Sequence, residues 1–176
     1  MSNDALTRPY MRKVKGERSL RPVTTVSRSD CTEALETFKE KCSCILGDSL
    51  VSIVLYGSRA QNMGRGDSDL DVLVVTEEPI EPEAELKVSD AEYELSLTDG
   101  VTLSPLFVCK KDILEGVRIR DRLLLGIVLG YRTLYDRKGF FASQIQRLKE
   151  NLKKENAVYN ARERCWHIPG MRMAGR

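Results

Sequence analysis

Residues 51–76 read VSIVLYGSRAQNMGRGDSDLDVLVVT, and this stretch decides the fold prediction for the chain. β-Branched and other apolar residues fill Val51–Tyr56 and Leu70–Val75, which predicts two buried strands. Gly57-Ser58 follows the first strand, and Asp69-Leu70-Asp71 opens the second. The stretch therefore predicts two neighbouring strands joined by a Gly-Ser turn and a connection containing Gly and Arg, with polar groups gathered at one end of the pair.

The two aspartates are the first candidate functional residues. Side chains alternate along a strand, so Asp69 and Asp71 are expected on the same side, about 7 Å apart along the pleat. Carboxylates this close repel each other at neutral pH unless a cation lies between them. Mg²⁺ (or Mn²⁺) takes oxygen ligands and completes its shell with waters and substrate phosphates, so it suits such a pair. The alternative interpretation is a solvated strand end or a helix cap.

The Gly-Ser turn is the second candidate. Glycine lets the backbone turn sharply and lets a ligand approach closely. A helix opening at Ser58 would present free N–H groups and the positive end of its dipole, which is an anion site. Arg59 and Arg65 could add charge-assisted hydrogen bonds to phosphate. An ordinary strand-to-helix turn is the alternative here.

The rest of the chain predicts further helices and strands, with a long helix near the carboxyl end. Helices are predicted at 30–47, 81–97, 111–116, 118–129 and from Gly139 to about Cys165, and further strands at 101–108 and 132–135. Pro105 confines the strand 101–108 to a sheet edge or a bulge. Four helices carry an expected apolar face, consisting of Leu35, Phe38 and Cys42, of Leu86, Tyr93 and Leu97, of Ile119, Leu123 and Ile127, and of Phe141, Ile145, Leu148 and Leu152. The predicted division is a basic arm at 1–28, a central domain at 29–140, and a helix and tail at 141–176.

Length and composition set the class of protein. The 176 residues suffice for one domain, and 41% hydrophobic with 31% charged residues is typical of a soluble globular chain. Five cysteines without C-x-x-C spacing suit a reducing cytoplasm. A lone histidine, His167, excludes His-paired zinc hydrolysis. The longest nearly apolar run, 123–131, is too short to span a membrane, and the amino terminus has no apolar signal region. We therefore expect a cytoplasmic protein.

Charge is distributed unevenly behind a net charge of +2. Residues 1–30 hold seven basic and three acidic side chains, and residues 137–176 hold ten and three. Residues 77–99 hold nine acidic side chains and only Lys87. The basic ends could contact phosphates or an acidic partner, although solvated surface is the usual role of such charges.

The combined pattern of Gly-Ser, ten residues and then Asp-x-Asp, flanked by apolar strands, resembles the DNA polymerase β-type nucleotidyltransferase superfamily, especially its small minimal nucleotidyltransferase (MNT-like) members. The matching blocks are Gly57–Ala60 and Gly66–Val72, including Ser68 just before the first aspartate. The resemblance makes 29–140 a nucleotidyltransferase domain and implies the α+β fold of that family, in which a small mixed β-sheet is flanked by helices. It implies transfer of a nucleoside monophosphate from a nucleoside triphosphate, with ATP as the expected donor, to an acceptor hydroxyl, with release of pyrophosphate.

The resemblance also implies roles for single residues. Asp69 and Asp71 would hold Mg²⁺ and act as the catalytic carboxylates, and Gly57 and Ser58 would hold the β- and γ-phosphates. Arg59, Arg65 and Ser68 complete the expected nucleotide-binding set.

Family members commonly carry a third carboxylate on the following strand, and here the chain departs from the family. That strand offers only Thr102 and Ser104. Asp99 and Glu94 are the remaining candidates for the third carboxylate.

Two interpretations of function stay open at this point. The first is an enzyme that modifies a protein or RNA hydroxyl, and the resemblance suggests a HEPN-type protein of a toxin–antitoxin system as a partner. The second is a catalytically weak or degenerate nucleotidyltransferase fold that works by binding a partner, such as the antitoxin of a HEPN-type toxin. The last helix could also pair two copies as a homodimer, although an amphipathic helix usually packs on its own domain.

Overall fold

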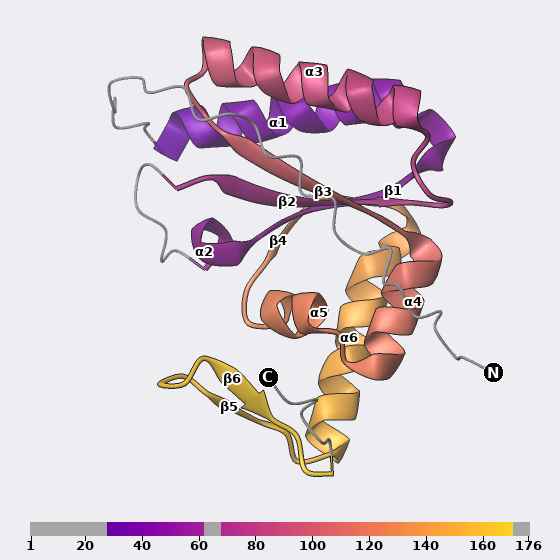
Figure 1. Ribbon diagram of the computed structural model, residues 1–176, viewed down its shortest axis with the longest axis vertical. Coiled ribbons are helices and arrows are strands. Elements are labelled where there is room, and N and C mark those ends of the chain that lie inside the picture. The colour runs from indigo at the N-terminus through magenta and orange to yellow at the C-terminus, as the bar shows by residue number, and fades with distance from the viewer. Residues whose placement is uncertain (1–27, 62–67, 171–176) are drawn as a thin grey trace, which may run out of the picture.

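Four strands form one mixed sheet in the order β3-β2-β1-β4 (Figure 1). The computed structural model describes residues 28–61 and 68–170. Strand β1 pairs antiparallel with β2 and β4, and β2 pairs parallel with β3. Each strand coincides with a predicted one, and Pro105 lies on an edge strand as expected. The strands are β1 (Leu50–Tyr56), β2 (Leu70–Thr76), β3 (Leu103–Cys109) and β4 (Arg132–Asp136).

Helices cover both faces of this sheet, so the fold is α+β as predicted. Helices α1 and α3 lie on one face, and α4, α5 and α6 lie on the other (Figure 1). The helical segments are α1 (Arg28–Leu46), η1 (Gly47–Ser49), α2 (Gly57–Ala60), α3 (Pro82–Thr98), α4 (Lys110–Ile119), α5 (Arg122–Ile127), η2 (Arg137–Gly139) and α6 (Phe140–Lys154). A two-stranded hairpin of β5 (Val158–Asn160) and β6 (Cys165–His167) follows α6.

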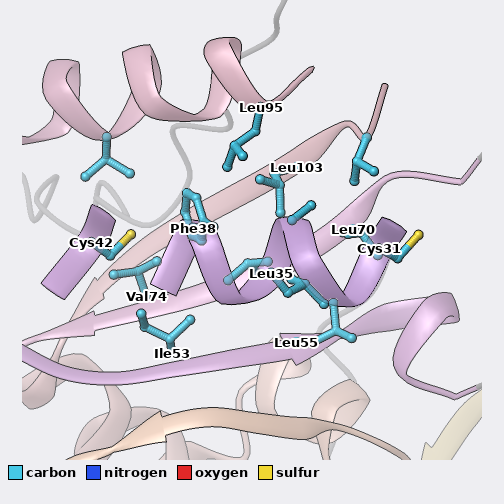
Figure 2. Close-up of a cluster of buried hydrophobic side chains, with 14 of the residues drawn as sticks. Cys31, Leu35, Phe38, Cys42, Ile53, Leu55, Leu70, Val74, Leu95 and Leu103 are labelled. Atoms are coloured by element: carbon cyan, nitrogen blue, oxygen red, sulfur yellow. The ribbon is translucent and has the colours of Figure 1, made fainter. Parts of the chain in front are cut away.

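The period-2 alternation of β2 divides the core into two clusters. Leu70, Val72 and Val74 face α1 and α3, while Leu73 and Val75 belong to the cluster under α4–α6. Figure 2 shows Leu35 and Phe38 of α1, Leu95 of α3 and Ile53 of β1 meeting in the first cluster. Phe38 is fully buried, so its truncation to Ala would cost about 3–5 kcal/mol.

Helix α6 uses its apolar face inside the chain. Its predicted residues Phe141, Ile145, Leu148 and Leu152 are all buried in the second cluster. The helix ends at Lys154, however, and not near Cys165. Asn156 adopts a left-handed backbone with φ +53°, and Trp166 of the following hairpin donates Nε1–H to the carbonyl of Leu125. The prediction of one long helix was wrong because the apolar repeat ends at Leu152 and the polar remainder turns back onto α5.

The prediction for helix α3 named the wrong face. The buried residues are Val88, Ala91 and Leu95, whereas the predicted Leu86, Tyr93 and Leu97 are exposed. Both sides of α3 carry apolar side chains at helical spacing, so periodicity alone could not choose between them. The side with the small residue Ala91 packs inward, where α3 lies along α1.

The boundary between α4 and α5 also differs from the prediction. Helix α4 continues to Ile119 and ends at Arg120, whose φ of +56° is left-handed. Asp121 then caps α5 by accepting a hydrogen bond from the amide of Leu123. Ile119 is therefore the exposed end of α4 and not part of the apolar face of a helix at 118–129. No helix in the described part of the chain is long and apolar enough to cross a membrane.

Candidate functional site

Gly57 joins the two halves of the predicted site. Strand β1 ends at Tyr56, which pairs with Asp71 of β2, and Gly57 follows with φ +77°. A Cβ atom at Gly57 would lie 2.4 Å from Oδ2 of Asp71. Glycine is therefore required both for the left-handed backbone and for the close approach of the carboxylate. The Gly-Ser turn and Asp71 meet in space, as the sequence pattern predicts.

Asp71 also affects the residue opposite it. Burial, and then the negative charge of Asp71, raise the pKa of Tyr56 to about 12. Asp71 is half-buried and shares its side of β2 with Leu73 and Val75. On β3 the residue in register with Asp71 is Ser104, so this strand places no carboxylate beside it.

Asp69 lies just before β2 and is exposed. The start of the strand is fixed by Leu70, whose amide donates to the carbonyl of Thr102 at 2.9 Å. Asp69 is the residue whose charge acts on Glu92 of α3. Burial first, and then the charge of Asp69, raise the pKa of Glu92 to about 7. Glu92 is therefore a carboxylate of α3 whose charge is coupled to that of Asp69.

Glu92 was missed by the sequence analysis. It follows Val88 by four residues and precedes Leu95 by three, so it lies beside the buried stripe of α3. In the part of the chain that the structure describes, Glu92 has no ion pair or hydrogen bond. A carboxylate beside the buried side of α3 could have pointed to Glu92. The sequence analysis named the other side of the helix as buried, so Glu92 was not considered.

The two carboxylates named from the sequence lie elsewhere. Glu94 is exposed and accepts a hydrogen bond from Nζ of Lys41 on α1 at 2.6 Å. Asp99 ends α3 as its C-terminal cap. Glu94 thus joins two helices at the surface, and Asp99 lies at the turn towards β3.

The structure describes three of the four polar residues of the predicted phosphate site, namely Ser58, Arg59 and Ser68. Ser58 and Arg59 lie in α2, a single turn, and both are half-buried. Nη2 of Arg59 lies 2.6 Å from Sγ of Cys31, so the guanidinium reaches the start of α1. Arg65 lies outside the described residues. Ser68 is half-buried and precedes Asp69 directly.

The loop after α5 packs against the end of the Gly-Ser turn. A Cβ atom at Gly130 would lie 2.7 Å from Cγ of Gln61, the residue that ends α2. The amide of Gln61 donates to the carbonyl of Gly57 at 3.2 Å. These contacts hold the turn between β1 and the α5–β4 loop.

The donor set at this end of the sheet consists of oxygen atoms. In residues 28–61 and 68–170, no group of three or more His, Cys, Asp or Glu side chains is arranged to hold a metal by itself. Two carboxylates are nevertheless a normal protein contribution to Mg²⁺, since waters and substrate phosphates supply the other ligands. Asp69 and Asp71 therefore fit a hard divalent cation that arrives with a phosphorylated substrate.

Comparison with known proteins identifies the family of the chain. Residues 33–123, just over half of the chain, match the model of the nucleotidyltransferase domain. The chain belongs to the nucleotidyltransferase family. The matched region begins in α1 and contains the Gly-Ser turn, both aspartates and Glu92.

Two curated relatives of this nucleotidyltransferase come from Methanocaldococcus jannaschii. The protein named "Putative protein adenylyltransferase MJ1305" is 32% identical over 136 residues, which is 76% of this chain and 91% of the relative. The protein named "Putative protein adenylyltransferase MJ0141" is 32% identical over 81 residues, which is 46% of this chain and 81% of the relative.

Solved structures show weaker likeness. Spectinomycin adenyltransferase AAD(9) from Enterococcus faecialis, with ATP and spectinomycin, is 13% identical with a TM-score of 0.49, covering 70% of this chain and 66% of that one. A toxin–antitoxin structure with AMP-PNP is 16% identical with a TM-score of 0.42, covering 69% of this nucleotidyltransferase and 92% of that chain.

Proposed function

We propose that this nucleotidyltransferase moves a nucleoside monophosphate, with ATP as the donor, to a hydroxyl group of a protein acceptor. The observation that carries the proposal is the close approach of the Asp71 carboxylate to Gly57, which brings the Gly-Ser block and the Asp-x-Asp block of the motif together. The names of the two archaeal relatives favour adenylyl transfer and a protein acceptor over RNA.

Asp69 and Asp71 are the proposed ligands of Mg²⁺. Their oxygen atoms suit this ion, and Asp71 has room only because position 57 carries no side chain. When bound, Mg²⁺ neutralises the triphosphate and stabilises the negative charge that develops at the α-phosphorus. The chain itself supplies the position and orientation of these charges.

The Gly-Ser turn is the proposed binding site of the β- and γ-phosphates. Gly57 allows the phosphates to approach the backbone, and the Ser58 hydroxyl can donate a hydrogen bond to them. Arg59, Arg65 and Ser68 are the proposed additional donors to the nucleotide.

Glu92 is the proposed acceptor of the proton. The acceptor oxygen attacks the α-phosphorus, and its O–H bond breaks as the new P–O bond forms. The bond from the α-phosphorus to the bridging oxygen breaks, and pyrophosphate leaves with that electron pair. The proton passes to a carboxylate of Glu92, which the helix holds near Asp69 and which has no cation partner in the described residues.

The alternative function is a binding module on a degenerate transferase fold, such as an antitoxin that pairs with a HEPN-type toxin. Ser104 in register with Asp71 favours it, since the strand lacks the carboxylate that family members commonly carry. In this case the chain would bind its partner and turn over little or no nucleotide.

A label-transfer assay separates the two functions. The chain is incubated with Mg²⁺, each α-labelled nucleoside triphosphate in turn, and a lysate of its host. We expect labelled protein with ATP, and at least a ~1000-fold loss in Asp69→Asn and Asp71→Asn. Asp48→Asn is the matched control, because Asp48 is exposed at the opposite end of β1. Absence of transfer by the wild type with every nucleotide would contradict the enzyme.

We place the activity in the cytoplasm. Every cysteine in the described residues is free, which suits a reducing compartment.

A further inference from the structure

Helix α3 carries a row of large apolar side chains that no part of the described structure covers. Leu86, Tyr93 and Leu97 are 66%, 65% and 45% exposed. At about 100° per residue they fall within roughly 40° of one another around the helix. The buried residues Val88 and Leu95 lie on the opposite side. We call Leu86, Tyr93 and Leu97 the outer stripe of α3.

The outer stripe has an acidic border. Glu83, Asp90 and Glu94 follow one flank of it at helical spacing, and all three are exposed. Helix α3 as a whole holds five acidic residues and one lysine. Glu83 pairs with Lys87 and Glu94 with Lys41, so the border is net acidic and Asp90 is its carboxylate without an ion pair among the described residues. An exposed apolar row with a charged border is typical of a protein-binding surface.

The net negative charge of α3 indicates what kind of surface could bind to the outer stripe. A second copy paired antiparallel on this stripe would bring the acidic border of one helix against that of the other, which is unfavourable. A surface with apolar side chains bordered by lysine or arginine would complement both the exposed apolar row and its acidic border. Its cations would face Asp90, and would compete for Glu83 and Glu94 with their present partners Lys87 and Lys41.

We propose that the outer stripe of α3 docks a protein partner that presents an apolar helix face bordered by basic residues. This surface goes beyond the proposed transfer reaction, and it does not require that the chain be catalytically active. It lies next to the candidate site, because Tyr93 follows Glu92 directly in the helix.

A designed peptide tests this proposal directly. The probe is a fluorescein-labelled amphipathic helix with leucine on one face and lysine on its borders, and its counterpart carries glutamate in place of each lysine. Binding to the full chain is measured by fluorescence anisotropy at low and high salt. We expect the lysine peptide to bind at least ~10-fold more tightly than the glutamate peptide, and to weaken as salt rises.

Matched variants locate the binding. Tyr93→Ser combined with Leu97→Ser should weaken binding of the lysine peptide at least ~10-fold, since the apolar centre of an interface carries most of its affinity. Leu114→Ser removes a leucine of similar exposure (44%) on α4 and should leave binding unchanged. Thermal melts of the variants check that the fold is retained.

Three results would overturn the proposal. These are no binding of the lysine peptide to the wild type, equal binding by the Tyr93→Ser Leu97→Ser variant, and a wild-type dimer in light scattering that this variant dissociates. The peptide should bind Asp69→Asn and Asp71→Asn like the wild type. Failure of docking and failure of the transfer reaction are therefore separate results.

Discussion

Glu77 and Glu92 lie at opposite ends of the sheet, and their pKa values are shifted in opposite directions. At the end where β2 finishes, Glu77 accepts hydrogen bonds from Lys110 at 3.0 Å and from Arg137 at 2.5 Å. The hydrogen bond from Lys110, with the charges of both cations, lowers the pKa of Glu77. At the end where β2 begins, burial first, and then the like charge of Asp69, raise the pKa of Glu92 to about 7. Glu77 is thus paired with two cations, whereas Glu92 has no ion pair among the described residues.

A pocket of about 640 Å³ lies at the Glu77 end and is lined by Lys110, Phe140 and Ser143 among others. Glu77 also lines this pocket, and its carboxylate already pairs with Lys110 and Arg137. Nζ of Lys110 lies 5.3 Å from the centre of the Phe140 ring. At the other end, burial and the charge of Asp69 perturb a carboxyl group that has no ion pair among the described residues, a pattern that is common at functional sites. The comparison therefore favours the Glu92 end as the functional one.

Of the variants that compare the two glutamates, Glu92→Gln has the largest expected effect, because it removes the proposed proton acceptor. Glu92→Gln should lower the rate of label transfer about 10²- to 10⁴-fold, which is the usual contribution of a general base, while Mg²⁺-dependent ATP binding stays intact. Glu94→Gln is the matched control on the same helix, because Glu94 is exposed and paired with Lys41. Equal rates in Glu92→Gln and the wild type would remove Glu92 from the mechanism.

The next effect concerns the position of Asp71. Gly57→Ala should lower transfer about 100-fold, because the new Cβ would displace the carboxylate and small displacements at a reacting centre have effects of this size. Gly139→Ala introduces a side chain at a comparable positive φ of +65° with no atom within 4 Å. The two variants thus share the backbone strain and differ in the clash. Similar transfer rates in both would show that the close approach has no importance for activity.

A smaller effect appears in stability. The folded chain binds more protons than the unfolded chain between pH 4.5 and about 7, so the contribution of Glu92 to stability falls as pH rises through this range. Glu92→Gln removes that loss. In the absence of divalent cations it should raise the free energy of unfolding by ~1–3 kcal/mol at pH 8 and by much less at pH 4.5. Urea titrations at both pH values measure the difference, and a destabilised variant at pH 8 would contradict the assignment.

The smallest effect has the opposite sign. The pKa of Glu77 is lowered in the folded chain, so its ion pairs stabilise the fold above the ordinary carboxyl pKa and lose this effect as pH falls. Glu77→Gln should therefore reduce stability at pH 7 and have little effect at pH 3. Transfer should be unaffected. If Glu77→Gln lost as much transfer as Glu92→Gln, the conclusion that only the Glu92 end takes part in the reaction would be wrong.

The sequence predicted most of the sheet and the two halves of the motif because these depend on local patterns. Apolar β-branched runs identified β1 and β2, and the Gly-Ser and Asp-x-Asp blocks identified the end of the sheet that carries polar groups. Pro105 correctly indicated an edge strand, since proline cannot donate a ladder hydrogen bond.

The remaining features depend on tertiary packing. Which side of α3 is buried was decided by its contact with α1 and the sheet, and the sequence offered two apolar sides. Glu92 could be found only once that side was known. The end of α6 depended on a left-handed Asn156 and on the return of Trp166 to the carbonyl of Leu125.

Isothermal calorimetry of ATP binding tests the central claim most directly. The account predicts that ATP binds to the wild type when Mg²⁺ is present, and at least ~10-fold more weakly when the metal is chelated. The Asp69→Asn Asp71→Asn double variant should lose this dependence on Mg²⁺, and Glu77→Gln should behave like the wild type. ATP binding that ignores Mg²⁺ in the wild type, or that keeps its Mg²⁺ dependence in the double variant, would contradict the account.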